Sequence, residues 1–193
     1  MPTPDEVVSA LLEGNGRFRA GLRPQRNYSE HDLEAIAQQQ KPIAAVVACA
    51  DSRVTPEIVM DQPLGQLFCA RVPGNVAAES AQWMVEIAVR EFQVPVVLVL
   101  GHTRCLAVTQ VVQGSVYAAA GELGRTVSRA VFEAKLTNPA DLMRASLEAN
   151  VRQTMKELLA KNEALAKNVR DGQAKVLGGI YEMESGFVTM LKS

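Results

Sequence analysis

The sequence predicts an α/β fold in which helices flank a central, mostly parallel β-sheet. Two apolar runs, 42–48 and 95–101, carry this prediction, because strands that are apolar along their whole length are typical of parallel sheets buried on both faces. Segments with helical spacing of apolar residues separate the strand-like runs, and this alternation indicates βαβ units. We expect about four strands and a short edge strand, within a single domain that spans residues 1–193.

Two helices are expected before the first strand. The first begins at Thr3, because Pro4 suits the first helical position and Glu6 completes a capping box. The second begins at Ser29 and ends near Gln40, after a polar, turn-rich connection. The chain thus opens with helices rather than with the sheet.

The remaining elements alternate between strand and helix. In order, we expect a strand ending at Cys49, a short helix from Thr55 to about Gln62, a strand over 66–72, a long helix over 77–92 and a strand ending at Gly101. Helices fill most of 103–170, and a fourth strand over 174–181 precedes a turn and the edge strand. This order is that of a parallel sheet with helical crossovers.

Composition and charge exclude several classes of partner. Hydrophobic residues make up 48% of the chain and charged residues 21%, as in soluble globular proteins, and the formal net charge is −1 without a basic tract. We expect no nucleic acid and no membrane as partner, also because no run approaches the roughly 20 apolar residues of a membrane span. Three cysteines suggest no disulfide framework and no signal-peptide pattern is visible, so we expect a cytoplasmic protein.

Metal-binding side chains follow two of the predicted strands. Cys49 ends the first apolar run, and His102 and Cys105 follow the third strand. In open α/β sheets, ligands bind at the carboxyl ends of the strands, where these side chains would converge if the strands are neighbours. Two thiolates and an imidazole suit Zn²⁺, and three protein ligands leave the open fourth position of a catalytic zinc site.

An acid–base pair stands next to the first of these ligands. Asp51 and Arg53 lie just past the strand and two residues apart, a spacing that can place a carboxylate and a guanidinium side by side in a bidentate pair. A carboxylate near an open zinc position has two possible roles. It can accept a hydrogen bond from bound hydroxide, or bind the metal as a fourth ligand and close the site.

These residues carry a family resemblance. Residues 49–53 (CADSR) and 102–105 (HTRC) resemble the two zinc motifs of the β-class carbonic anhydrases. The resemblance covers nearly the whole chain, because four further segments are similar to parts of the family: 11–18, 61–68, 71–75 and 178–186. It implies a lyase that hydrates CO2 reversibly to bicarbonate and a proton through zinc-bound hydroxide. It also implies Cys49, His102 and Cys105 as zinc ligands and Asp51 with Arg53 as the catalytic dyad.

The resemblance carries two further expectations. Gln62 falls near a glutamine that helps to line the substrate pocket of the family. The family's minimal unit is a dimer, often doubled, in which N-terminal helices lie on the partner subunit. The resemblance therefore implies a homodimer or a dimer of dimers, with residues 4–40 as a dimerisation arm.

The sequence departs from the family at two positions. Val46 stands where one branch of the family has a Trp that helps to form a non-catalytic, inhibitory bicarbonate site. Tyr181 matches another residue of that bicarbonate site. Because the Trp is missing, we do not expect this chain to have the inhibitory site. Leu106 stands where the family usually has Gly, next to a zinc ligand. Leu106 keeps two alternatives open: hydrolysis of a CO2-like substrate such as COS or CS2, or a zinc-bearing inactive relative that serves as a scaffold or bicarbonate binder.

Two other residues receive structural interpretations. Cys69 belongs to no motif and is expected to be a structural, partly apolar side chain. Arg104 lies between two predicted zinc ligands, and a surface salt bridge is the interpretation we favour for it.

Overall fold

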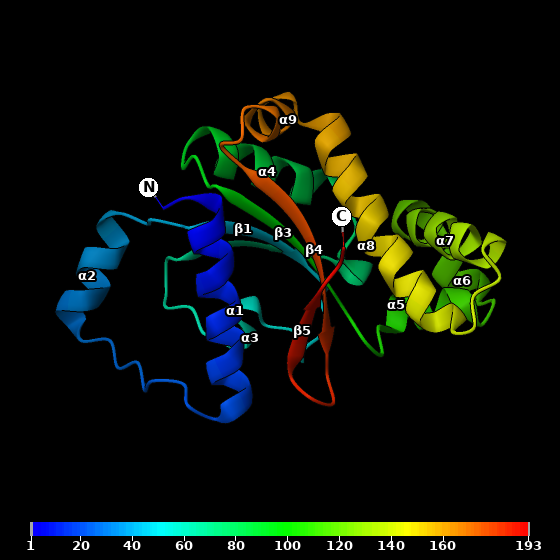
Figure 1. The fold of residues 1–193 in the computed structure, drawn as a ribbon, viewed down its shortest axis with the longest axis horizontal. Helices are drawn as coiled ribbons and strands as arrows, with labels where there is room; N and C mark the ends of the chain where they lie inside the picture. The colour runs from blue at the N-terminus through cyan, green and yellow to red at the C-terminus, as the bar shows by residue number, and fades with distance from the viewer. Residues whose placement is uncertain (1, 193) are drawn as a thin grey trace.

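Five strands form one sheet in the computed structural model, which describes residues 2–192 (Figure 1). The spatial order is β2-β1-β3-β4-β5, and only the β4–β5 pair is antiparallel. The strands are β1 (Ala44–Ala48), β2 (Leu67–Arg71), β3 (Val96–His102), β4 (Lys175–Glu182) and β5 (Phe187–Met190). The predicted α/β class, with four strands in a parallel arrangement and a short edge strand, is confirmed.

The two most apolar strands are neighbours at the centre of the sheet. Every residue of β1 and β3 is buried. Their parallel register pairs Ala44 with Val96 and Ala48 with Leu100. The two strands therefore end at the same edge of the sheet, and the residues that follow them emerge side by side.

Helices cover both faces of the sheet. They are α1 (Pro4–Ala20), α2 (Glu30–Gln38), α3 (Pro56–Val59), α4 (Glu79–Arg90), α5 (Leu106–Val112), α6 (Val116–Ala119), α7 (Gly121–Leu136), α8 (Leu142–Lys161) and α9 (Glu163–Arg170), with a short 3₁₀ turn at Pro73–Asn75. One core lies between the sheet and α1 with α3, and the other between the sheet and α4, α5, α8 and α9, with α7 packed outside α5 and α8. Within residues 2–192, no helix is both long and apolar enough to cross a membrane.

Two glycines allow α8 to pack closely on the sheet. A Cβ atom added to Gly101 would lie 2.6 Å from Cγ2 of Val151, and one added to Gly178 would lie 2.7 Å from Cγ1 of the same residue. Such distances are too short for carbon atoms in contact. Small residues on β3 and β4 thus set the distance at which α8 covers the strand ends.

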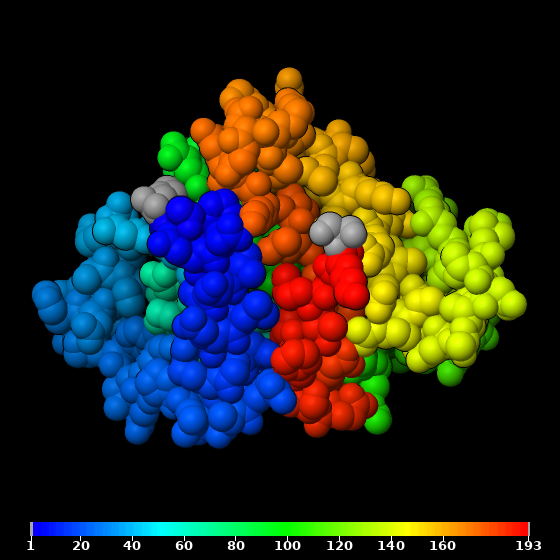
Figure 2. All heavy atoms as spheres, in the orientation of Figure 1, coloured from blue at the N-terminus to red at the C-terminus, as the bar shows by residue number. Residues whose placement is uncertain are grey.

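The N-terminal helices differ in how they are attached. Both predicted capping boxes form, at Thr3 and at Ser29. Helix α1 buries Val7 and Leu11 against the sheet of its own chain and lies beside the C-terminal hairpin (Figure 2). Helix α2 buries no residue and stands away from the sheet (Figure 1). The dimerisation arm stays a prediction.

Helix α3 is shorter than the sequence indicates. The prediction extended it to about Gln62, but it ends at Val59, because Asp61 adopts a positive φ of 46°. The side chain of Asp61 is fully buried and accepts hydrogen bonds from Arg17 at 2.6 Å and from Arg26 at 2.5 Å. These long-range contacts outweigh the local tendency to continue the helix.

Candidate metal centre

Three metal-binding side chains converge at the carboxyl edge of β1 and β3. Cys49 directly follows β1, His102 is the last residue of β3, and Cys105 is the N-cap of α5. All three are buried, and their ligand atoms lie within 4.8 Å of one another. The two Sγ atoms are 4.0 Å apart. A tetrahedral zinc ion with Zn–S distances of about 2.3 Å separates two sulfurs by about 3.8 Å, so the spacing fits this metal.

The imidazole of His102 is oriented as a metal ligand. Its Nδ1 donates a hydrogen bond to the carbonyl oxygen of Thr103 at 2.8 Å. Its Nε2 is buried and has no hydrogen-bond partner among the described residues. Buried polar atoms are almost always paired, and a metal-binding histidine characteristically donates its other ring nitrogen to a carbonyl or carboxylate. The unpaired Nε2 therefore fits a metal ion that binds between it and the two thiols.

Backbone amides stabilise negative charge on both sulfurs. The backbone N–H groups of Asp51 and Gly74 act to lower the pKa of Cys49, and those of Ala107 and Val108 in the first turn of α5 act in the same direction on Cys105. A hydrogen bond from Cys105 lowers the pKa of Cys49 to about 4, whereas the Cys49 thiolate and burial raise the pKa of Cys105. Without a metal the two thiols therefore share one proton. A bound divalent cation would displace it, because metal-bound thiols are deprotonated.

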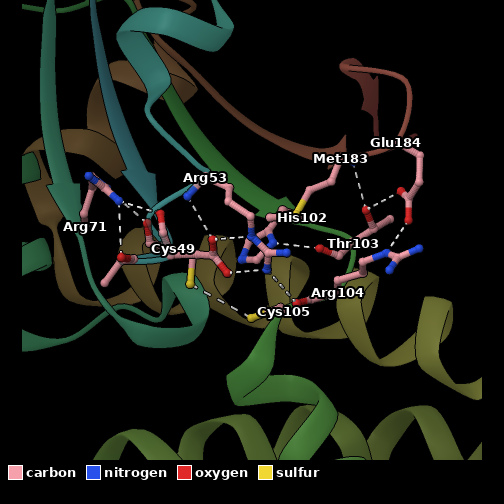
Figure 3. A network of polar contacts seen from close by, with 11 residues as sticks. Cys49, Arg53, Arg71, His102, Thr103, Arg104, Cys105, Met183 and Glu184 are labelled. Carbon is pink, nitrogen blue, oxygen red and sulfur yellow. Dashed lines mark hydrogen bonds and ion pairs between the residues drawn. The ribbon is translucent and has the colours of Figure 1, made fainter.

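Asp51 and Arg53 form the bidentate pair that their spacing predicts. Nε of Arg53 lies 2.9 Å from Oδ1 of Asp51, and Nη2 lies 2.8 Å from Oδ2 (Figure 3). Hydrogen bonds from this guanidinium hold the pKa of Asp51 well below its usual range. The carboxylate is therefore ionised at neutral pH, two residues from a candidate metal ligand.

Arg71 is a further residue of the site, and its role was not predicted. From the end of β2 it donates hydrogen bonds to three consecutive carbonyl oxygens, those of Cys49 at 3.2 Å, Ala50 at 3.2 Å and Asp51 at 2.6 Å (Figure 3). These bonds hold the loop that carries both the first thiol and the carboxylate. The pairing of β1 with β2 is what brings Arg71 there, and this pairing cannot be read from residue types alone.

An apolar cavity of about 760 Å³ opens beside the ligands. Cys49 and Asp51 form part of its wall, and the side chains of Leu106, Leu123 and Val127 supply apolar surface. A cavity with mostly apolar walls and a few polar groups at one end is typical of a small-molecule site. This cavity could hold a small apolar substrate next to the metal position.

Comparison with known proteins gives the family. The sequence model of the carbonic anhydrase family matches residues 44–188. Carbonic anhydrase 2 of Mycobacterium tuberculosis is 34% identical over 195 residues, which cover 96% of this chain and 93% of that protein. The β-carbonic anhydrase CafA of Aspergillus fumigatus has a similar structure, with a TM-score of 0.72, 25% identity and coverage of 96% of this chain and 91% of CafA. This chain belongs to the β-carbonic anhydrase family.

The fold of the family extends to more distant members. A tetrameric β-carbonic anhydrase from Sordaria macrospora shares 18% identity with this chain, with a TM-score of 0.70 over 97% of this chain and 98% of its own. CO2 hydration is the general activity of carbonic anhydrases. The predicted family and fold are thus confirmed, and the cluster described above lies inside the region that the family model matches.

Leu106 occupies the cavity wall of this β-carbonic anhydrase. It is the first residue of α5, the residue is 66% exposed, and it lines the cavity together with Cys49 and Asp51. The first turn of α5 is intact, with the N–H of Thr109 donating to the carbonyl oxygen of Cys105 at 2.8 Å. The helix start is therefore undisturbed, and the side chain of Leu106 lines the cavity that opens beside the candidate metal ligands.

Two other predicted residues lie apart from the cavity. The side chain of Gln62 donates to the carbonyl oxygen of Met60 at 2.8 Å and is not part of the cavity wall. The structure of the single chain therefore does not bring it to the candidate site, and its role in substrate binding stays a prediction. Cys69 lies in β2, partly buried and outside the cluster, and burial raises the pKa of its thiol.

Proposed function

We propose that this protein is a zinc enzyme that interconverts CO2 and bicarbonate. Cys49, His102 and Cys105 would hold the ion, and the observation that carries the proposal is the buried Nε2 of His102, which faces two thiols and lacks any other partner among the described residues. Zinc bound there would lower the pKa of a coordinated water and so supply hydroxide near neutral pH. The fourth position would face the apolar cavity beside Asp51.

Asp51 and Arg53 would orient the attacking water. An ionised carboxylate accepts hydrogen bonds only, so Asp51 would take the O–H of the water and direct its lone pair toward the carbon of CO2. Arg53 engages both oxygens of Asp51 and keeps them from the metal position. We propose that Asp51 becomes a fourth metal ligand only in a closed state, when these bonds break.

The cavity would bind CO2 through apolar contacts. Leu106 and Val127 lie on its wall, and they offer CO2 no hydrogen bond that would have to break before reaction. Water and bicarbonate are better solvated outside than at these walls, which favours exit of the product. The apolar side chains of the wall thus support a substrate without charge.

We also propose a cytoplasmic homodimer or dimer of dimers. Tyr117 at the cavity is 91% exposed and Val116 beside it is 85% exposed, so an apolar surface next to the candidate site is uncovered in the single chain. Helix α2, within the predicted arm at residues 4–40, buries no residue of its own chain. Three free cysteines fit a reducing compartment.

A test combines metal analysis with a CO2 hydration assay. Purified protein should contain about one zinc per chain, and should accelerate pH change in CO2-saturated buffer under stopped flow. Removal of zinc by a chelator should abolish the rate, and zinc alone should restore it. A protein that binds no zinc, or a rate that survives complete metal removal, would overturn the proposal.

Hydrolysis of COS or CS2 is a second candidate, because Leu106 lines the cavity at the position where the resemblance led us to expect glycine, and so gives it a different wall. Sulfide release by zinc-loaded protein, faster than its hydration of CO2, would support it. The inactive-scaffold alternative is less well supported, since the Asp51–Arg53 pair is intact.

A further inference from the structure

The short loop between β3 and α5 has an uncommon backbone conformation. Arg104 adopts a positive φ of 57°, a backbone conformation that residues other than glycine rarely adopt. His102 and Cys105, two of the proposed zinc ligands, flank the two loop residues Thr103 and Arg104. Such a conformation persists only where the surroundings hold it in place.

The turn of the C-terminal hairpin supplies what holds this loop. The carboxylate of Glu184 accepts a hydrogen bond from the hydroxyl of Thr103 at 3.2 Å and an ion-paired hydrogen bond from Nε of Arg104 (Figure 3). The hydroxyl oxygen of Thr103 accepts the N–H of Met183 at 3.0 Å, and the N–H of Thr103 donates to the carbonyl oxygen of Tyr181 at 3.0 Å. One carboxylate therefore binds both residues of the loop.

Each loop residue then presents its carbonyl oxygen to the site. The carbonyl of Thr103 accepts from Nδ1 of His102 at 2.8 Å, and so leaves Nε2 free for a metal ion. The carbonyl of Arg104 lies 3.5 Å from Nη2 of Arg53, the same nitrogen that binds Asp51. The loop thus touches both the metal-binding imidazole and the guanidinium of the proposed dyad.

The hairpin is itself anchored to the body of the protein. Asn15 of α1 is buried, donates to the carbonyl oxygen of Gly186 at 2.8 Å and accepts from the N–H of Val188 at 3.0 Å. Glu184 is therefore presented from a turn whose far side is tied to α1. A rigid support of this kind is what a distant residue needs in order to orient a metal ligand.

We propose that Glu184 is a positioning residue, which acts through Thr103 and Arg104 to hold His102 in its metal-binding tautomer and Arg53 on Asp51. The proposal deepens the proposed function and rests on it for the metal and for the dyad. The first part, the tautomer of His102, concerns the metal-free protein as well. It can therefore be tested even if the proposed chemistry fails.

The test in metal-free protein uses nitrogen-15 NMR of the histidine side chains. The chain contains two histidines, and the second, His31, is exposed and serves as an internal reference for an averaged tautomer. Wild type should show His102 as the Nδ1–H tautomer, and Glu184→Ala should move its shifts toward those of His31. Hydrogen exchange of the Thr103 amide should rise by about tenfold. Glu86→Ala, which breaks an exposed pair with Arg90, is the matched control and should change neither.

The test in metal-loaded protein uses cobalt in place of zinc. Loss of outer partners of metal ligands typically costs about 10–100-fold in metal affinity or activity. Glu184→Ala should shift the visible absorption of the cobalt site and speed cobalt release to a chelator by about tenfold. Thr103→Val should reproduce the effect, and the double variant should add little to it.

Glu184→Gln keeps the volume of the side chain and loses only the charge, so it serves as the second variant if Glu184→Ala folds poorly. An intermediate shift in the His102 signals supports the proposal. Folded Glu184 variants with the tautomer and the amide exchange of wild type would overturn it. Failure of the proposed function has a different signature, which is a wild-type protein that binds no zinc.

Discussion

Arg53 donates two side-chain hydrogen bonds to Asp51, from Nε to Oδ1 at 2.9 Å and from Nη2 to Oδ2 at 2.8 Å. The backbone N–H of Arg53 adds a third bond, to Oδ1 at 3.0 Å. Because one guanidinium engages both oxygens, the carboxylate would have to give up two charge-assisted bonds before it could bind a metal ion. The pair therefore favours a site with an open fourth position.

Replacement of Arg53 tests this relationship. We expect Arg53→Ala to abolish CO2 hydration and to retain zinc, because the released Asp51 can then bind the metal and complete a four-ligand site of the structural kind. Zinc analysis and stopped-flow hydration on the same preparation provide the measurement. Arg90→Ala, which breaks an exposed pair with Glu86, is the control and should leave both unchanged. Near-normal hydration by Arg53→Ala would contradict the dyad.

The metal ligands can be separated from the third cysteine. We expect Cys105→Ala to lose zinc and activity, since only Cys49 and His102 would remain to bind the ion. Cys69→Ala should keep about one zinc per chain, because Cys69 lies outside the cluster. Plasma emission spectrometry of dialysed protein measures both. Normal zinc content in Cys105→Ala would refute the assignment.

The pH dependence of activity follows from the charge of the ligands. Two thiolates place more negative charge on the metal than three histidines do, so a bound water should be less acidic than at an all-histidine site, where its pKa is about 7. We expect CO2 hydration to rise above about pH 8. At low pH the closed state with Asp51 as fourth ligand should compete more effectively. A flat rate between pH 6 and pH 9 would rule out both effects.

Replacement of Leu106 should change the rate of CO2 hydration and leave zinc binding as it is. We expect Leu106→Gly to raise CO2 hydration, because it removes an apolar side chain from the cavity wall beside Cys49. Helix α5 should lose less than the roughly 1 kcal/mol that glycine costs relative to alanine in a helix interior, because Leu106 is the first residue of the helix. Zinc content should not change. Equal rates of CO2 hydration for wild type and Leu106→Gly would show that Leu106 serves only packing. The proposal of a substrate other than CO2 would then lose its support.

The buried carboxylate of Asp61 should stabilise the folded protein to an extent that depends on pH. Burial alone would raise the pKa of Asp61, but hydrogen bonds from Arg26 and Arg17 outweigh it and lower the pKa. With an unfolded value of about 3.9, the stabilisation is fully present above that pH and is lost as the pH falls through the folded-state pKa.

We therefore expect Asp61→Asn to lower the free energy of unfolding at pH 7 by about 2–3 kcal/mol. The difference from wild type should shrink below about pH 4. Urea denaturation of both proteins at several pH values measures this difference in the free energy of unfolding. Asp171→Asn, which breaks an exposed pair with Lys167, is the control and should leave the free energy of unfolding nearly unchanged.

Much of the fold and the ligand set can be predicted from the sequence. The strands before Cys49 and His102 are recognised by uninterrupted apolar residues, and the helix starts at Thr3 and Ser29 by cap chemistry that acts over three residues. The spacing of Asp51 and Arg53 likewise predicts a pair that forms locally. These features depend on short stretches of chain, in which the residue types limit the backbone to few conformations.

Long-range contacts could not be predicted in the same way. Arg104 was expected to form a surface salt bridge and does so, but its partner Glu184 is 80 residues away and no pattern connects the two. The same holds for Arg71, which reaches the Cys49 loop only because β2 pairs with β1. Gln62 was assigned to the substrate pocket by resemblance, whereas its position depends on where α3 ends.

The sequence by itself determined the α/β class and the acid–base pair, because both depend on residue types at short spacing. It also indicated the candidate zinc ligands, because each of these residues closely follows an apolar run. Only the tertiary structure decided the rest: that β1 and β3 are neighbours, that Nε2 of His102 is buried without a partner among the described residues, and that Leu106 lines the cavity. The physical reason is that strand pairing and helix packing are chosen by the burial of the whole apolar surface at once, a quantity that belongs to no single segment of the chain.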